Sequence, residues 1–376
     1  MKHAVFAPLS LVLVVACAGS TPPPPAPPPA EPIASPAPPP PEPAKPAPAP
    51  EPTEAEKKAA EQLRTLQADR AKARATFEAE KARLTPEIVA AAKAIADKAY
   101  PTGAAALKAA LTSPARKPGD PERDARRHAV ETLTLCGFSP KWTVLEYGPG
   151  EGWYTELLAP ALYKQGKLLV TSPDPAGPQN ERPSHYGQIT KWFIEKAPEL
   201  YGKIETVLID PKAPDLKLEG TVDFVWVSRG LHGMVNNGTL TTYLAEFHAA
   251  LKPRGVLGVE QHRAKPDAVA TESSKKGYLP EKWVIEQIEA AGFKLAAKSE
   301  INANPKDTKD YPEGVWSLPP TLREGAKDRA KYEAIGESDR MTLKFVKVDA
   351  KAAVPASLKP AAGTPPAGAP AVIPQK

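Results

Sequence analysis

Two kinds of apolar spacing alternate along residues 142–348. The first short apolar run ends at Glu146 and reads as a buried strand. Similar runs follow at 167–171, 206–209, 222–227, 256–259, 294–299 and 341–348. Between several of these runs, residues 154–163, 189–197, 239–251 and 281–291 read as helices. Strands and helices that alternate in this way build an α/β fold. We therefore expect a Rossmann-like, seven-stranded doubly wound sheet.

The first 16 residues read as an export signal. A positively charged start precedes the apolar run 4–16, which is too short to span a bilayer easily. The run ends in Val14-Val-Ala-Cys17, which resembles the bacterial lipobox. The resemblance implies that 1–16 is a lipoprotein signal peptide, that Cys17 carries the lipid, and, with Ala18 following, that the inner membrane does not retain the chain. The alternatives are an ordinary secretory signal and a plain apolar start.

This resemblance implies a cell envelope lipoprotein, anchored in the outer membrane and facing the periplasm or the surface. The membrane is then a partner through the lipid on Cys17, since several acyl chains together hold a protein firmly. Residues 17–53 fit such an anchor, because 18 of the 47 prolines lie between Thr21 and Thr53. A segment so rich in proline forms neither helix interior nor sheet, so we expect a polyproline II tether.

Composition divides the rest of the chain into three segments. Residues 54–112 are rich in Ala, Glu, Lys and Arg and predict a helical spacer, ahead of a domain at 113–349 and a disordered Ala/Pro-rich tail at 350–376. Within the spacer, the helix 54–84 has few apolar side chains. We expect it to be solvated, with a homodimer through this helix as the alternative.

Cysteine, histidine and charge exclude several classes of function. Cys17 and Cys136 are the only cysteines, which rules out a disulfide-stapled scaffold, and Cys136 reads as a core residue. The six histidines are scattered, so we predict no metal site. The formal net charge of +5 is spread over many ionisable residues, so charge gives no support for a nucleic acid partner.

A glycine loop follows the first predicted strand. The strand ends in Glu146, and Gly148, Gly150 and Gly152 lead into a helix. Glycine lets the backbone approach a ligand closely and adopt conformations closed to other residues. Trp153 stands where a dinucleotide fingerprint needs its third glycine, and the Gly-Lys-Ser/Thr of a P-loop is absent. The alternative is a strand-to-helix turn that binds nothing.

The order of residues 146–152, in which the acid Glu146 is followed closely by Gly-x-Gly-x-Gly, resembles motif I of class I S-adenosylmethionine-dependent methyltransferases. Further segments make the chain similar, over about residues 121–348, to a family of exported predicted methyltransferases. These segments are Arg229-Gly-Leu-His232, Glu260-Gln-His-Arg263, Gly314-Val-Trp-Ser-Leu-Pro-Pro320 and Ile335-Gly-Glu-Ser-Asp-Arg-Met-Thr-Leu-Lys-Phe345. The resemblance implies S-adenosylmethionine as cofactor, held through the three glycines and Glu146, and methyl transfer to an acceptor that it does not identify.

Three aspartates complete the cofactor site that the resemblance implies. The family places an acid directly after strand two to hold the ribose hydroxyls, whereas here Asp174 comes a few residues later, beyond Pro173. The alternative is a turn-forming aspartate before Pro175. Asp210 and Asp215, in the loop after strand three, are candidates to meet the adenine amine, with plain solvation of the loop as the alternative.

Two histidines are the candidate bases, because an oxygen or nitrogen acceptor must lose a proton as the methyl group arrives. His232 follows the fourth strand, and His262 follows the fifth beside Glu260 and Arg263. Glu260 would orient the base and Arg263 would hold an anionic substrate. The alternative is that each histidine is a structural hydrogen-bonding residue. Asp339 and Arg340 read as a salt bridge that locks the last hairpin.

Two classes of function are open at this point. The first is an envelope-anchored methyltransferase, whose difficulty is that S-adenosylmethionine is made in the cytoplasm and does not cross a bilayer unaided. The second is a non-catalytic methyltransferase-fold module for binding or protein interaction at the envelope. The complete glycine motif favours the first, and the displaced acid at Asp174 favours the second.

Overall fold

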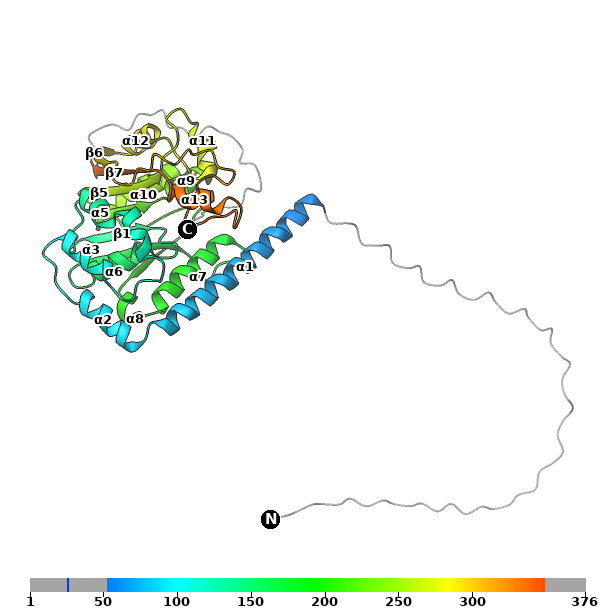
Figure 1. Ribbon diagram of the computed structural model, residues 1–376, viewed down its shortest axis with the longest axis horizontal. Coiled ribbons are helices and arrows are strands. Elements are labelled where there is room, and N and C mark those ends of the chain that lie inside the picture. Colours follow the sequence, from blue (N-terminus) through cyan, green and yellow to red (C-terminus); the bar gives the residue numbers. More distant parts are fainter. Residues whose placement is uncertain (1–25, 27–52, 349–376) are drawn as a thin grey trace, which may run out of the picture. The chain divides into compact units, whose positions relative to one another are not determined.

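The computed structural model describes residue 26 and residues 53–348. The predicted signal peptide, the lipidation site Cys17, nearly all of the tether and the tail 350–376 lie outside the described residues. Residues 53–348 fall within one compact unit (Figure 1). In this part of the chain, no helix combines the length and the apolar character needed to cross a membrane.

The core is one seven-stranded sheet in the order β3-β2-β1-β4-β5-β7-β6. Its strands are β1 (Thr143–Tyr147), β2 (Lys167–Pro173), β3 (Glu205–Ile209), β4 (Val222–Ser228), β5 (Leu251–His262), β6 (Phe293–Ser299) and β7 (Arg340–Lys347). Strands β3-β2-β1-β4-β5 pair in parallel, and β7 pairs antiparallel with both β5 and β6. The order reverses at β1, where the chain turns from one half of the sheet to the other. This confirms the predicted doubly wound sheet.

Helices surround the sheet. They are α1 (Glu54–Arg83), α2 (Pro86–Ala96), α3 (Gly103–Leu111), α4 (Asp124–Arg127), α5 (Ala129–Leu135), α6 (Thr155–Leu162), α7 (Arg182–Glu195), α8 (Pro198–Tyr201), α9 (Leu231–Asn236), α10 (Leu240–Ala250), α11 (Ala270–Ser273), α12 (Glu281–Ala290) and α13 (Arg329–Ile335). Short 3₁₀ helices lie at Pro121–Arg123, Ser274–Lys276 and Gly314–Ser317.

Alternate residues of each central strand feed two separate cores. Val144 of β1 and Phe224 of β4 pack with Leu157 of α6 on one face. Their neighbours Leu145 and Val225 pack on the other face, beneath α10 and α12. Because side chains alternate between the faces of a strand, strands covered on both faces read as continuous apolar runs. The sheet therefore carries helices on both sides and presents its ligand-binding edge at the carboxyl ends of the parallel strands.

Strand β5 is longer than the predicted run 256–259. Leu251 already pairs with Val222, and the register shifts before Val256 joins Phe224. Pro253 and Arg254 lie in this irregular stretch, where Arg254 takes a positive φ of 61°. Proline lacks the amide donor of a regular ladder, so the sequence pattern there resembles a turn and hides the start of the strand.

The first three helices belong to the same compact unit as the sheet, which corrects the predicted helical spacer. Leu107 and Ala110 of α3 have no exposed surface and lie in the core with α6. Helix α1 lies along α7, where Asp69 pairs with Arg182 and the Phe77 ring stacks on Trp192 at 5.9 Å (Figure 1). Helix α1 thus packs on the surface of the domain, against α7. The homodimer through residues 54–84 stays a prediction.

Candidate functional site

The glycine loop joins β1 to α6 in the conformation that its sequence requires. Gly148, Gly150 and Gly152 have φ values of 56°, 60° and 90°, all in the left-handed region that disfavours other residues. A Cβ on Gly152 would also lie 2.2 Å from the ring of Phe193. The Gly148 amide donates to Thr171 Oγ1 at 2.9 Å and ties the loop to β2. The loop is therefore fixed between β2 and α7 at the carboxyl end of β1.

Glu146 lies beneath this loop. Its side chain is buried, and Oε2 accepts a hydrogen bond of 2.8 Å from the hydroxyl of Thr155, the first residue of α6. Burial raises the pKa of Glu146 to about 8, because desolvation penalises the carboxylate more than the single hydrogen bond stabilises it. The carboxyl group is therefore mostly protonated at neutral pH, and a cation bound nearby would favour its ionisation.

A groove of about 2080 Å³ runs along the carboxyl edge of the sheet. Its floor comes from three strand ends: Gly150 and Glu151 after β1, Pro173 and Asp174 at β2, and Ile209 and Asp210 at β3. Ordinary small-molecule pockets hold roughly 300–1,000 Å³, so this groove has room for a nucleoside cofactor and a second molecule.

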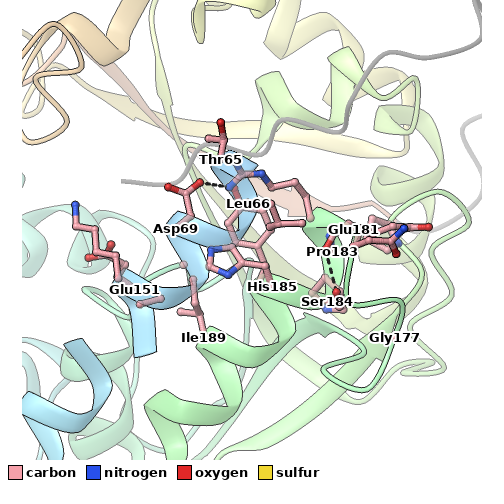
Figure 2. A pocket seen from close by; sticks show the side chains of 18 of the residues that line it. Thr65, Leu66, Asp69, Glu151, Gly177, Glu181, Pro183, Ser184, His185 and Ile189 are labelled. Atoms are coloured by element: carbon pink, nitrogen blue, oxygen red, sulfur yellow. Dashed lines mark hydrogen bonds and ion pairs between the residues drawn. The ribbon is translucent and has the colours of Figure 1, made fainter. Parts of the chain in front are cut away.

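Helices α1 and α7 supply the remaining walls of this groove. Figure 2 shows Leu66 and Asp69 of α1 with His185 and Ile189 of α7 at the groove. Leu66 is buried, and Arg70 of the same helix donates to the Gln179 carbonyl at 2.6 Å. These contacts fix α1 beside the loop that follows β2. This wall could not be predicted from the sequence, because α1 has a sparse and irregular set of apolar positions.

The predicted cofactor aspartates separate into two groups. Asp174 and Asp210 line the groove, whereas Asp215 is exposed and does not line it. Asp174 Oδ1 accepts from the Ala176 amide at 2.8 Å, as a turn-forming aspartate does, and Asp210 Oδ1 accepts from the Lys212 amide at 2.9 Å. Within the described residues, each of these two carboxylates has a second oxygen that accepts no hydrogen bond.

Glu260 is fully buried in a polar cluster at the ends of β4 and β5. It accepts hydrogen bonds of 3.0 Å from the hydroxyls of Tyr154 and Ser228, and Arg340 Nε lies 2.6 Å from its Oε1. Arg340 also binds Glu337 at 2.7 Å. The predicted ion pair between Arg340 and Asp339 is therefore wrong: Arg340 turns into the cluster instead.

Arg263 is held in a separate set of ion pairs. Its guanidinium pairs with Glu281 at 3.0 Å, Glu300 at 2.5 Å and Asp339 at 3.3 Å. Three carboxylates around one guanidinium make an anionic surrounding that repels an anionic substrate. Its position therefore favours a structural role, joining β5 to α12 and to the start of β7, over the predicted substrate contact.

The two candidate histidines lie side by side. The rings of His232 on α9 and His262 at the end of β5 are 5.8 Å apart. His262 Nδ1 lies 2.6 Å from Ser338 Oγ, and His232 Nδ1 lies 3.3 Å from Gln261 Nε2. His232 Nε2 has no hydrogen-bond partner within the described residues. The ring of Trp316, which lines the groove, packs 5.9 Å from His232. His232 itself does not line the groove but contacts this groove-lining ring.

Burial keeps both histidines neutral. Desolvation lowers the pKa of His232 to about 4 and holds the pKa of His262 well below its ordinary value, with the neighbouring guanidinium of Arg229 acting in the same direction. A neutral imidazole can accept a proton, so both rings are in the form that a general base needs at neutral pH. The low pKa also makes each a weak base.

We expect His232 to make the fold sensitive to acid. Its folded pKa of about 4 lies below the unfolded value near 6.5, so its neutral form contributes stability above pH 6.5 that is lost as pH falls from 6.5 to 4. His232→Gln should remove up to about 1.4 kcal/mol of this loss for each pH unit in that window. Denaturant titrations of parent and variant at pH 7, 6 and 5 measure it, and parallel pH profiles would contradict it.

No protein-family model and no curated protein matches the chain. Solved structures resemble it distantly. A methyltransferase from Aquifex aeolicus described as SAM-dependent has 18% identity and a TM-score of 0.40, covering 61% of this chain and 94% of its own. A Burkholderia thailandensis 1,6-didemethyltoxoflavin-N1-methyltransferase solved with S-adenosylhomocysteine has 17% identity and a TM-score of 0.37, covering 61% and 80%. None of these likenesses assigns a function to this chain.

Proposed function

We propose that this chain binds S-adenosylmethionine in the groove and transfers its methyl group to an acceptor. One observation carries the proposal: Gly150, Asp174 and Asp210 come from three separate strand ends, and all three line one groove. That groove lies at the carboxyl edge of a doubly wound sheet, where such folds bind nucleotides. The glycine motif and the sheet order are those that the class I methyltransferase resemblance implies.

Each part of the groove has a group suited to a part of this cofactor. The glycine loop leaves room for the methionine portion, Asp174 can accept from the ribose hydroxyls, and Asp210 can accept from the adenine amine. The carboxyl group of Glu146 is buried and, like Gly148 and Gly152, does not line the groove, so Gly150 is the residue of the predicted motif that is placed to meet the cofactor directly. The residues present therefore fit the cofactor in shape and in hydrogen-bonding capacity.

When bound, the cofactor supplies an electrophilic methyl group on a positively charged sulfur. The chain then has to place an acceptor in line with that methyl group and remove a proton from it. Neutral His232, with an unpaired Nε2 behind Trp316, is the candidate for the proton.

We expect Asp174→Asn to weaken binding of S-adenosylmethionine at least 10-fold, because a hydrogen bond to a charged group contributes about 1.5–3 kcal/mol. Calorimetric titration of the cofactor into parent and variant measures the change. Asp215→Asn is the matched control, since it removes a loop carboxylate outside the groove, and its affinity should equal that of the parent. A folded parent that binds no cofactor, or equal weakening by both variants, would overturn the proposal.

The second candidate is a non-catalytic module for binding or interaction at the cell envelope. The turn at Asp174 favours it, because the hydrogen bond from Ala176 occupies one oxygen of the predicted ribose acceptor. The same titration separates the two candidates, since a module without cofactor binds nothing in the groove. For either candidate, we further propose an outer-membrane anchor on Cys17, to be tested by mass spectrometry of the mature N-terminus.

A further inference from the structure

Arg229 directly follows β4, at the edge where a doubly wound sheet admits its ligands. Its φ is 56°, a conformation that a residue with a side chain rarely takes and that clusters at functional sites. The Arg229 amide donates to the Glu260 carbonyl at 2.6 Å and fixes the backbone there. Its side chain is 15% exposed, whereas those of Arg127 and Arg340 are 1% and 2% exposed. Of these three, Arg229 reaches solvent most readily.

The carboxylate nearest to Arg229 is already occupied. Glu337 pairs with Arg123 at 3.1 Å, with Arg127 at 3.3 Å and with Arg340 at 2.7 Å. Arg229 Nη1 lies 3.9 Å from Glu337 Oε2, which is too far for a hydrogen bond. Glu337 therefore interacts most strongly with the three closer guanidinium groups, and its electrostatic attraction to Arg229 is weaker.

The cluster as a whole has one positive charge in excess. Its four guanidinium groups belong to Arg123, Arg127, Arg229 and Arg340, and its three carboxylates belong to Asp120, Glu260 and Glu337. The adjacent His232 and His262 are neutral at pH 7. An unbalanced guanidinium in a mostly buried position favours an anion as its partner, because few water molecules are there to solvate it.

We propose that Arg229 binds an anionic group of the methyl acceptor, a carboxylate or a phosphate. The inference rests on the proposed methyl transfer. A guanidinium offers two parallel donors that match either anion. Arg229 does not line the groove of Gly150, Asp174 and Asp210, so the anion it attracts is separate from the cofactor site. His232, three residues further on, lies close enough for the charge of Arg229 to lower its pKa.

Simple anions test this site without knowledge of the acceptor. In thermal unfolding of the full chain at constant ionic strength, about 10 mM inorganic phosphate or acetate should raise the Tm of the parent by about 2 °C. Arg229→Gln should abolish the shift. The matched control Arg254→Gln should keep it, because Arg254 is an exposed arginine that also has a left-handed backbone, with φ 61°. A response to phosphate or to acetate alone identifies which anion the site prefers.

Cofactor titration separates this inference from the proposed function. Arg229→Gln should bind S-adenosylmethionine as the parent does, and loss of that binding would show instead that Arg229 holds the carboxylate of the cofactor, which overturns the inference. No shift in the parent, or equal shifts in all variants, would also overturn it. Should Arg229→Gln fail to fold, Arg229→Lys keeps the charge without the paired donors and should halve the shift or reduce it further.

Discussion

Replacement of Arg340 by methionine should lower the free energy of unfolding by about 3–5 kcal/mol, which is the cost of removing one partner from a buried ion pair. The Arg340 side chain is 2% exposed and lies between Glu260, at 2.6 Å, and Glu337, at 2.7 Å. Its removal leaves the Glu260 carboxylate without its cation in a site that has no access to water. The expected result is a protein that unfolds at clearly lower denaturant concentration.

Arg329→Met is the matched control for this change. Arg329 pairs with Glu333 at 2.8 Å on the surface of α13, where both side chains are about half exposed. An exposed pair contributes about 0–1 kcal/mol, so urea titration of this variant should resemble that of the parent. Glu260→Gln combined with Arg340→Met should recover part of the lost stability, because no buried charge then remains unpaired at that position. Equal stability of Arg340→Met and Arg329→Met would contradict the described cluster.

Gly150→Asp should abolish detectable binding of S-adenosylmethionine, a loss of at least about 100-fold in affinity. Gly150 lines the groove with a φ of 60°, and aspartate tolerates this backbone conformation better than most residues with a side chain. The protein should therefore fold, but its new side chain fills the space that the glycine leaves for the cofactor. Equilibrium dialysis with radiolabelled cofactor measures the loss.

Gly220→Asp is the matched control, because it introduces the same side chain at a glycine with a similar backbone conformation that lies outside the groove. Gly220 has a φ of 61°, and no atom lies within 4 Å of a Cβ built there. It does not line the groove. This variant should carry a similar backbone cost and bind the cofactor normally. If both variants lost binding to the same extent, the effect of Gly150→Asp would be one of stability, and the groove assignment would lose its support.

The sheet was predictable because its central strands are buried on both faces. Continuous apolar runs such as residues 224–227 leave little ambiguity, and the glycines after β1 mark the turn that follows. The start of β5 was harder to predict, since Pro253 and Arg254 interrupt the apolar pattern within the strand itself. Local composition thus predicts the elements that the core encloses on both sides, and loses accuracy where the ladder becomes irregular.

The surroundings of the site were harder to predict, because they depend on pairs far apart in sequence. The place of α1 is fixed by contacts such as Asp69 with Arg182, which no local pattern reveals. Arg263 looked free to bind an anion, and only the fold brings Glu281 and Glu300 to it. Asp210 and Asp215 were indistinguishable in sequence, yet only Asp210 lines the groove.

The most direct test of the central claim is a structure determined with S-adenosylhomocysteine bound. We expect the ligand to lie in the groove, with its homocysteine end at Gly150, its ribose at Asp174 and its adenine at Asp210. A ligand bound elsewhere on the chain would overturn the assignment of the groove as the cofactor site. So would a groove that stays empty at ligand concentrations far above the affinities usual for cofactors.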